Sequence, residues 1–507
     1  MKTIGFIYRG IQQSGLYGAV EAENQLLRAI SLYSNWDRIV VWTSVKNTLG
    51  LQDERVIIRD FTNIIEDLRE FLVDCIHHVG LGASTLAGLR SISSAPVVTS
   101  VFPALSYHHQ ILDHFFEIST PKIPGDISIY PSNCSQEAVK RIYSTLTGYD
   151  STAQHPSYKV IPIGVDAEVF CRADSSTRCR TRELESIQQN AVVGVIISRF
   201  SPSDKADLLP LIRSIASNQS VKDSNLHFLL VGGDTYFGSK QYIDMLQKEI
   251  SELGLTKIVQ IKSINDRTQL IDVLKCADIF ISPADSVQET FGITPIEAMS
   301  CGLPAIVSDW NGYRETVVHG ETGFLVKTTF FNNSEIWESV GYNAHFREQH
   351  LVIGQSVVVN TDEIIRHCLT LSDNPIVLAQ MKARAEEVTK ENFSWRAVIR
   401  KYEQVWADLQ PPPRSFEMMP ARRIDYWSCF NHYATCRGSD EQTFEITSFG
   451  LDILHGRKSL RIIAGLESFL PIKMIKLILI SLSKNPCSIE SFDKLHDASK
   501  PSIRFVL

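Results

Sequence analysis

Glu289 and Glu297 are the residues of this 507-residue sequence best placed to do chemistry. They follow an apolar strand expected at 277–282 and flank the start of a short helix. Thr294 is expected to cap that helix, because a hydroxyl residue followed by proline is a common helix start, and Gly302 is expected to end it. Beyond the strand ends of a parallel sheet, helix N-termini favour phosphate. Two acids beside such a site indicate a nucleotide sugar, with backbone amides for the diphosphate and carboxylates for the hydroxyl groups.

The same pair of residues also has a purely structural interpretation. Thr294 and Glu297 fit the pattern Ser/Thr-x-x-Glu, a capping box in which the glutamate side chain closes the start of the helix. The pair by itself supports ligand binding and capping about equally. The motifs around the pair favour ligand binding.

Those motifs occur in a fixed order along the chain. They are Ala277-Asp278, Glu289-Thr-Phe-Gly292, Glu297-Ala-Met-Ser-Cys-Gly-Leu-Pro304 and Gly320-Glu-Thr-Gly-Phe-Leu325. In this order they resemble the family 4 glycosyltransferases, the glycosyl transferases group 1, which have the GT-B fold. The resemblance extends over about residues 1–410 and is strongest between 190 and 330. It implies an α/β protein of two doubly wound, Rossmann-like domains that face a cleft.

The resemblance also implies roles for the residues of the glutamate segment. In the family, the first acid contacts the donor sugar and the second contacts the ribose, so Glu289 and Glu297 are expected in those roles. Backbone N–H groups between them are expected to reach the sugar and the diphosphate, from Phe291, Gly292, Ile293 and Thr294. Gly292 permits a close approach because it has no Cβ.

Two cations follow the apolar strand expected at 192–198. Arg199 and Lys205 match the family's basic pair on the diphosphate, and cations at a strand end can neutralise a leaving nucleoside diphosphate. The alternative for Lys205 is a solvated loop residue that pairs with Asp204 or Asp207. No Asp-x-Asp motif stands at a strand end to hold a divalent ion. We therefore expect neither a metal nor another cofactor besides the donor.

Two further groups of candidates lie in the amino-terminal half. Gly15 and Gly18 lie in the loop after the first predicted strand, which in GT-B enzymes faces the cleft, although a flexible connection explains them equally well. Relatives often carry a histidine after the strand expected at 96–99, where this chain has Pro103. His108 and His109 follow and are candidates to reach the donor or the acceptor hydroxyl, although such pairs more often lie on a surface or cap a helix.

Strands and helices alternate along the first 410 residues, which predicts doubly wound domains. We expect an acceptor-side domain at 1–185 and a nucleotide-sugar domain at 186–410, closed by a helix at 392–402 that braces the first domain. Further strands are expected at 4–8, 38–42, 55–58, 74–79, 126–130, 160–166, 226–234, 259–262 and 304–308. The linker that begins with the three prolines at 411–413 leads to a small helical or winged-helix-like extension, which ends at residue 507.

The extension contains an apolar run at 470–482, interrupted by Lys473 and Lys476. Such a run can form an amphipathic helix at a membrane surface or on a protein partner. It can also be the buried core of a small helical domain. We expect a core as the commoner case, and peripheral membrane or protein contact as the alternative.

The composition is that of a globular protein, with 44% apolar residues and a net charge of −7. That charge gives no general attraction to nucleic acid, so no nucleic-acid partner is expected. The ten cysteines include no Cys-x-x-Cys and are interpreted as reduced core thiols. No segment has the apolar run of a secretion signal or of a membrane span, so a cytoplasmic location is expected.

The sequence therefore predicts a retaining glycosyltransferase, expected to transfer a hexose from a UDP-, GDP- or ADP-sugar to an acceptor that the sequence does not identify. Retention is implied by the resemblance. The replacement of the family histidine by Pro103 supports an alternative, a catalytically degenerate nucleotide-sugar-binding or regulatory protein. A phosphorylase or an epimerase on the same scaffold is a third interpretation.

Overall fold

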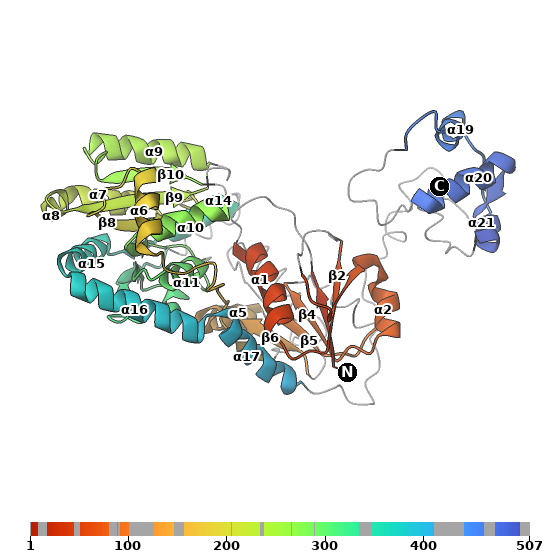
Figure 1. Ribbon diagram of the computed structural model, residues 1–507, viewed down its shortest axis with the longest axis horizontal. Helices are drawn as coiled ribbons and strands as arrows, with labels where there is room; N and C mark the ends of the chain where they lie inside the picture. The colour runs from red at the N-terminus through yellow and green to blue at the C-terminus, as the bar shows by residue number, and fades with distance from the viewer. Residues whose placement is uncertain are drawn as a thin grey trace.

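The computed structural model describes residues 2–8, 18–44, 51–80, 89, 92–100, 125–146, 157–203, 205–233, 238–264, 266–287, 289–333, 346–409, 441–460 and 472–496. These residues form two parallel sheets with helices packed on them, followed by a smaller C-terminal segment (Figure 1). The GT-B architecture expected from the sequence, two Rossmann-like domains, is present.

The first sheet contains seven parallel strands in the order β3-β2-β1-β4-β5-β6-β7. The strands are β1 (Thr3–Ile7), β2 (Arg38–Thr43), β3 (Val56–Asp60), β4 (Cys75–Val79), β5 (Val97–Ser100), β6 (Ile127–Tyr130) and β7 (Tyr158–Val160). The helices are α1 (Gly18–Tyr33), the 3-10 helix η1 (Phe61–Asn63), α2 (Ile64–Glu70) and α5 (Asn133–Leu146). Side chains of β1 alternate between two cores, with Ile4 and Phe6 on one face and Ile7 on the other. Both faces are therefore covered, as parallel sheets require.

The strands predicted in this half are confirmed to within about two residues, except the one at 160–166, which was wrong in extent. β7 ends at Val160. Beyond β7 the backbone runs to the segment before residue 395, where the Val165 N–H donates to the Phe393 carbonyl at 2.7 Å. That pairing takes residue 165 away from the sheet.

The second sheet contains six parallel strands in the order β10-β9-β8-β11-β12-β13. The strands are β8 (Val192–Ile197), β9 (Leu226–Gly232), β10 (Val259–Ser263), β11 (Ile279–Ser282), β12 (Ala305–Ser308) and β13 (Gly323–Val326). The helices are α6 (Ser175–Leu184), α7 (Leu209–Ser217), α8 (Gln219–Lys222), α9 (Ser239–Glu252), α10 (Arg267–Cys276), α11 (Ile293–Ser300), α12 (Tyr313–Thr316), α14 (Phe346–Gly354), α15 (Thr361–Asp373) and α16 (Pro375–Asn392). Strands β14 (Thr328–Phe330) and β15 (Val357–Val359) form a separate antiparallel pair.

Helices cover both faces of the second sheet. Val193 and Val195 of β8 belong to the core that includes α10 and α11, whereas Ile196 belongs to the core that includes α7, α9 and α15. Successive strand residues point to opposite faces, so a strand covered on both sides is apolar throughout. This explains the continuous apolar runs in the sequence and confirms the doubly wound prediction.

The closing helix is α17 (Trp395–Ala407), which packs beside α1 of the first domain (Figure 1). The Trp395 indole donates to the Gln25 side chain at 2.9 Å, and the Tyr402 hydroxyl lies 3.0 Å from that of Ser100. These contacts hold α17 against the first domain. The predicted start at 392 was wrong, because residue 392 ends α16 and the Ser394 side chain caps α17.

The described part of the C-terminal extension contains three helices and a short strand pair. They are α19 (Ser448–Leu454), α20 (Ile472–Lys484) and α21 (Ile489–His496), with β16 (Thr443–Phe444) antiparallel to β17 (Cys487–Ser488). In α20, Ile478 and Leu482 are buried in a small core, while Ile472, Leu477 and Ile480 are exposed. The apolar run therefore serves a core on one side, and contact of the extension with a membrane or a partner stays a prediction.

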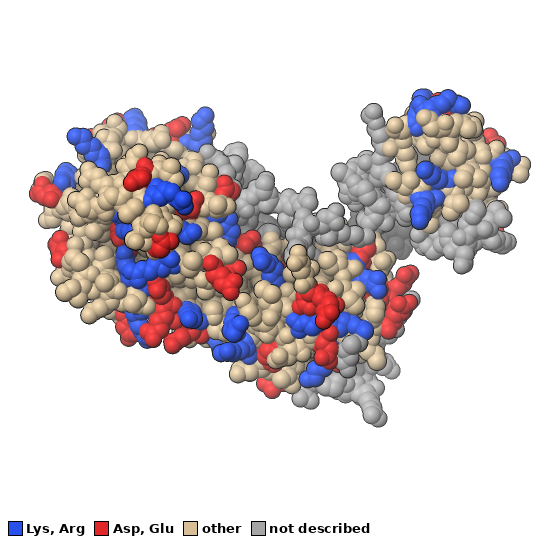
Figure 2. All heavy atoms as spheres, viewed as in Figure 1, with Lys and Arg blue, Asp and Glu red and all other residues tan. Residues whose placement is uncertain are grey.

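Charged groups are interspersed over the described surface shown in Figure 2, where Lys and Arg lie among Asp and Glu. Within the described ranges, no helix is long and apolar enough to cross a membrane. The eight cysteines in those ranges are free thiols, four of them buried. Cys171 and Cys179 are exposed, so the interpretation of the cysteines as core residues was wrong for these two.

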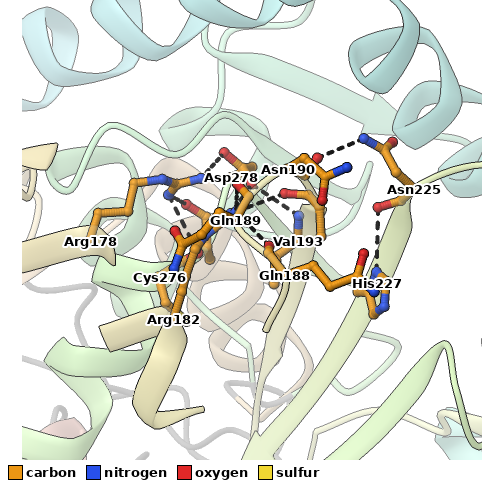
Figure 3. Close-up of polar contacts among 12 residues, drawn as sticks. Arg178, Arg182, Gln188, Gln189, Asn190, Val193, Asn225, His227, Cys276 and Asp278 are labelled. Carbon is orange, nitrogen blue, oxygen red and sulfur yellow. Dashed lines mark hydrogen bonds and ion pairs between the residues drawn. The ribbon is translucent and has the colours of Figure 1, made fainter. Parts of the chain in front are cut away.

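Asp278, just before β11, joins several elements of the second domain through buried charges (Figure 3). One carboxylate oxygen accepts from Arg178 at 2.6 Å and from Lys382 at 2.7 Å. The other accepts from Arg182 at 2.6 Å and from the Val193 N–H at 3.0 Å. Burial would raise the pKa of Asp278, but the charges of Lys382 and Arg178 outweigh it and hold the pKa below its usual value. The cluster ties α6, α16 and β8 to the start of β11.

Replacing Asp278 with asparagine leaves buried cations without a counter-charge. We expect Asp278→Asn to lower the free energy of unfolding by roughly 3–5 kcal/mol, the usual cost of breaking a buried pair from one side. Denaturant titration followed by circular dichroism measures it. Glu249→Gln, which breaks the exposed ion pair with Arg213, is the matched control and should change stability only marginally. Equal effects of the two substitutions would contradict a structural role for the Asp278 cluster.

Candidate active site

The candidate site lies where the order of the second sheet reverses. β8 pairs with both β9 and β11, although β9 and β10 separate them in the sequence. At such a point the loops after the two strands run to opposite sides, and ligands bind in the crevice between them. The loop after β8 carries Arg199 and Lys205, and the loop after β11 carries Glu289.

Lys205 and Glu289 form an ion pair across this crevice. The Lys205 ammonium lies 2.7 Å from a Glu289 carboxylate oxygen, with side-chain exposures of 31% and 12%. Both groups are thus held by each other and still partly accessible. Asp207, one of the expected partners of Lys205, instead accepts from Gln355 at 3.2 Å and from Tyr242 at 3.2 Å. Two candidate residues that are distant in the sequence are thus brought together.

Arg199 follows β8 in a tight turn. Its carbonyl accepts from the Ser201 N–H at 2.7 Å and from the Ser198 hydroxyl at 3.0 Å. A Cβ on Gly232, at the end of β9, would lie 1.9 Å from the Ser198 carbonyl. The glycine at this strand end is therefore required for close packing against the Arg199 turn.

Helix α11 begins two residues earlier than the sequence predicted, because Pro295 was expected as its first residue. Its first residue is Ile293, and its N-cap is Gly292 with φ +93°, so the prediction that Thr294 caps the helix was wrong. Proline is accepted anywhere in the first helical turn, because N–H groups there have no acceptor within the helix. A Cβ on Gly292 would lie 2.3 Å from the ring of Tyr313. Glycine is thus required here both by the backbone conformation and by the aromatic ring beside it.

Glu297 contacts an arginine and does not close the helix. Its carboxylate lies 2.5 Å from the Arg267 guanidinium, and no side chain caps α11, so the capping-box interpretation was wrong. Burial raises the pKa of Glu297 to about 7, against the opposing charge of Arg267. An additional hydrogen-bond donor from a ligand would favour its ionised form. Arg267 was missed from the sequence, because an arginine at the start of a helix resembles an ordinary surface residue.

Asp285 is a second buried acid that was missed. One oxygen of its carboxyl group accepts from the Asp207 N–H at 3.0 Å and so joins the loop after β11 to the loop that carries Lys205. Burial, and then the charge of Asp207, raise the pKa of Asp285 to about 7. Its position three residues after β11 is the only signal that the sequence offered.

The loop between the two glutamates also contacts the first domain. The Ser132 hydroxyl donates to the Thr290 carbonyl at 2.6 Å. The Glu315 carboxylate accepts from the Asn133 and Cys134 N–H groups at 2.8 Å, at the start of α5. The candidate site therefore borders the interface between the domains.

Some predicted residues receive no structural description. Gly15, His108, His109 and Pro103 lie outside the described residues, as does Asp204. Gly18 is the first residue of α1. Phe291 is buried, with its ring 6.2 Å from that of Phe393.

In the part of the chain that the structure describes, no group of three or more His, Cys, Asp or Glu could hold a metal ion.

The residues that form this site match a known family. Residues 182–340 match the family model described as Glycosyl transferases group 1. This segment is similar to group 1 glycosyltransferase domains. The match confirms the resemblance that the motifs indicated, over the segment in which the resemblance is strongest.

Relatives of the group 1 domain include D-inositol 3-phosphate glycosyltransferases. That of Streptomyces avermitilis is 29% identical over 176 residues, which cover 34% of this chain and 37% of the relative. That of Corynebacterium aurimucosum is 23% identical over 344 residues, 66% of this chain and 72% of the relative. The first match thus spans less than half of the relative's length.

Solved structures extend the likeness to both domains. HepE of Anabaena in complex with UDP-glucose is 18% identical and covers 81% of this chain and 100% of its own, with a TM-score of 0.57. A glycosyltransferase of Rickettsia africae is 16% identical and covers 80% of this chain and 98% of its own, with a TM-score of 0.58. The chain therefore has the GT-B fold.

Gly292 and Gly320 allow a matched test of the packing at the start of α11. Both have positive φ, but only Gly292 has a ring where Cβ would be, since nothing lies within 4 Å at Gly320. Alanine at Gly320 should cost on the order of 1 kcal/mol for the left-handed backbone. Alanine at Gly292 should cost roughly 1–3 kcal/mol more, because the Tyr313 ring must move. Unfolding of the two variants measures the difference, and equal costs would contradict the packing.

Asp285 makes the stability depend on pH. Because its pKa is raised from 3.8 to about 7, the native state binds the proton more tightly than the unfolded state. Asp285 therefore contributes fully to the free energy of unfolding below pH 3.8. This contribution declines as the pH rises from 3.8 to about 7, by up to about 1.4 kcal/mol per pH unit. Asp285→Asn removes the titration but keeps the oxygen that accepts the Asp207 N–H. Denaturant unfolding from pH 4 to 8 should show wild type losing stability relative to this variant, and parallel curves would contradict the assignment.

Proposed function

We propose that this chain is a retaining glycosyltransferase that moves a sugar, expected to be a hexose, from a nucleotide-sugar donor to an acceptor. The observation that carries the proposal is the ion pair of Lys205 and Glu289, which joins the two loops at the reversal point of the second sheet. A cation and an acid held together beside a helix N-terminus suit a ligand that has both a diphosphate and hydroxyl groups.

Each group has a distinct part in the proposed reaction. The cations of Lys205 and Arg199 offset the negative charge that develops on the leaving diphosphate, together with the free N–H groups at the start of α11. Glu289 accepts hydrogen bonds from the donor sugar and fixes the ammonium of Lys205. Glu297 receives the ribose, as the family resemblance implies. Retention of the anomeric configuration is likewise proposed from the resemblance.

The names of the relatives direct the choice of substrates to test. HepE of Anabaena was crystallised with UDP and with UDP-glucose, which supports UDP-sugars as the first donors to test, before GDP- and ADP-sugars. The related D-inositol 3-phosphate glycosyltransferases make inositol phosphate one acceptor to include. A cytoplasmic location, where nucleotide sugars are available, remains part of the proposal.

The first test is donor binding and turnover by the full chain. Thermal shift and nucleoside diphosphate release are measured with UDP-, GDP- and ADP-sugars, with and without a panel of acceptors. Stabilisation by one donor with acceptor-dependent release supports the transferase. Stabilisation without release under every condition favours a nucleotide-sugar-binding protein. An isomeric sugar with no new glycoside would indicate an epimerase.

Substitution of the ion pair tests the site itself. Lys205→Met and Glu289→Gln should each lower kcat/KM by about 100-fold or more, because each removes a group that stabilises the transition state. Lys248→Met breaks the exposed ion pair with Glu252 on α9 and is the matched control, expected to retain full turnover. Circular dichroism checks the fold of each variant. Turnover within threefold of wild type in both site variants would remove the assignment.

A further inference from the structure

Arg267 lies between the proposed donor site and the first domain. From the start of α10, its guanidinium contacts the Glu297 carboxylate at 2.5 Å and lies 3.7 Å from the Glu21 carboxylate on α1. The Phe170 ring supports the guanidinium, with 4.9 Å between the charge centre and the ring centroid. A planar guanidinium can hold two carboxylates and stack on a ring at the same time, which a lysine ammonium does less well.

The contact continues along the first domain as a chain of hydrogen bonds. The carboxylate oxygen of Glu21 that faces Arg267 accepts from the Gln25 side-chain amide at 2.8 Å, one turn further along α1. The Gln25 carbonyl oxygen accepts from the Trp395 indole N–H at 2.9 Å. Both ends of the Gln25 amide are thus used, and a rotation of that amide would break both bonds.

Trp395 stands where the chain returns from the second domain to the first. The backbone of Val165, on the connection between the domains, pairs with residues 393 and 395 at 2.7 and 3.3 Å. A Cβ on Gly164 would lie 2.3 Å from the Trp395 ring, so the two crossings are packed without space between them. Trp395 therefore lies at the junction of the two domains, in contact with both the crossing and α1.

We propose that Arg267 is a positioning residue that orients Glu297 for the nucleotide and couples it to the domain crossing through Glu21, Gln25 and Trp395. This inference rests on the proposed function only for the identity of the ligand at Glu297. A ribose hydroxyl that donates to Glu297 favours the ionised carboxylate, which keeps Arg267 between the two domains. Nucleotide binding and closure of the cleft are thereby linked.

Two variants interrupt this series of hydrogen bonds within the first domain, away from the proposed donor site. Glu21→Gln removes the charge that faces Arg267, and Gln25→Met removes the link to Trp395 without a change of charge. Glu403→Gln is the matched control. The Glu403 carboxylate accepts from the Asn35 N–H of the first domain at 2.8 Å, but it takes no part in the hydrogen-bond series that links Arg267 to Trp395. Small-angle X-ray scattering of the ligand-free full chain should show expansion of both test variants and none of the control. Scattering curves identical to wild type for both test variants would overturn the proposal.

Calorimetric titration with UDP measures the link to the nucleotide. UDP is expected to compact the wild-type protein, whereas Glu21→Gln and Gln25→Met should bind UDP about 3–10-fold more weakly and show no such compaction. Unchanged affinity and compaction in both would overturn the coupling. If wild type binds neither UDP, GDP nor ADP, the proposed function fails. The ligand-free scattering still decides whether the hydrogen bonds of Glu21, Gln25 and Trp395 hold the two domains together.

Kinetics separate positioning from a general loss of structure. Arg267→Met should raise the KM for the donor at least 10-fold with a smaller effect on kcat. Arg267→Lys should have a KM between those of wild type and Arg267→Met, because the charge on Glu297 is again paired. Loss of kcat alone, or a lysine variant no better than methionine, would contradict the positioning role.

Discussion

The pairing of β8 with β11 determines the arrangement of the candidate site. Parallel strands end on the same side of a sheet, and here the chain leaves β8 in one direction and β11 in the other. Lys205 and Glu289, 84 positions apart, meet at 2.7 Å because of this pairing. The ends of the strands also bring the N-terminus of α11 beside them, so that cations, acids and free N–H groups collect in one place.

Charge is used differently at the two ends of the second sheet. At the amino end, the buried carboxylate of Asp278 receives three cations, of which Arg182 is fully buried. At the carboxyl end, Asp285 and Glu297 are buried acids whose pKa values are raised to about 7. Raised pKa values at the carboxyl end indicate carboxyl groups that lack enough compensating interactions, and such groups are typical of functional sites. The first arrangement stabilises a fold, and the second suits a site that a ligand completes.

The interface between the domains is part of the site. Thr290 lies next to Glu289 and accepts from Ser132 of the first domain, while Arg267 contacts Glu297 on one side and Glu21 on the other. A single hydrophobic core includes residues of both domains and of α17, so the domains are joined by packing as well as by polar contacts. A ligand that binds between the loops therefore acts on contacts that hold the domains together.

The sequence by itself determined most of the secondary structure, because buried parallel strands require apolar runs and the turns between them require glycine and polar residues. It also made Glu289 and Glu297 candidates through motifs in a fixed order, and Arg199 and Lys205 candidates through their match to the family's basic pair. It misplaced the start of α11, because Gly292 in the left-handed region and Pro295 within the first turn give the same local signal as a capping residue at 294. Only the tertiary structure decided that Glu297 pairs with Arg267 and that Asp285 is buried against Asp207. Those contacts join residues 30 and 78 positions apart, and their existence depends on how strands and helices pack, which the local pattern of residues does not specify.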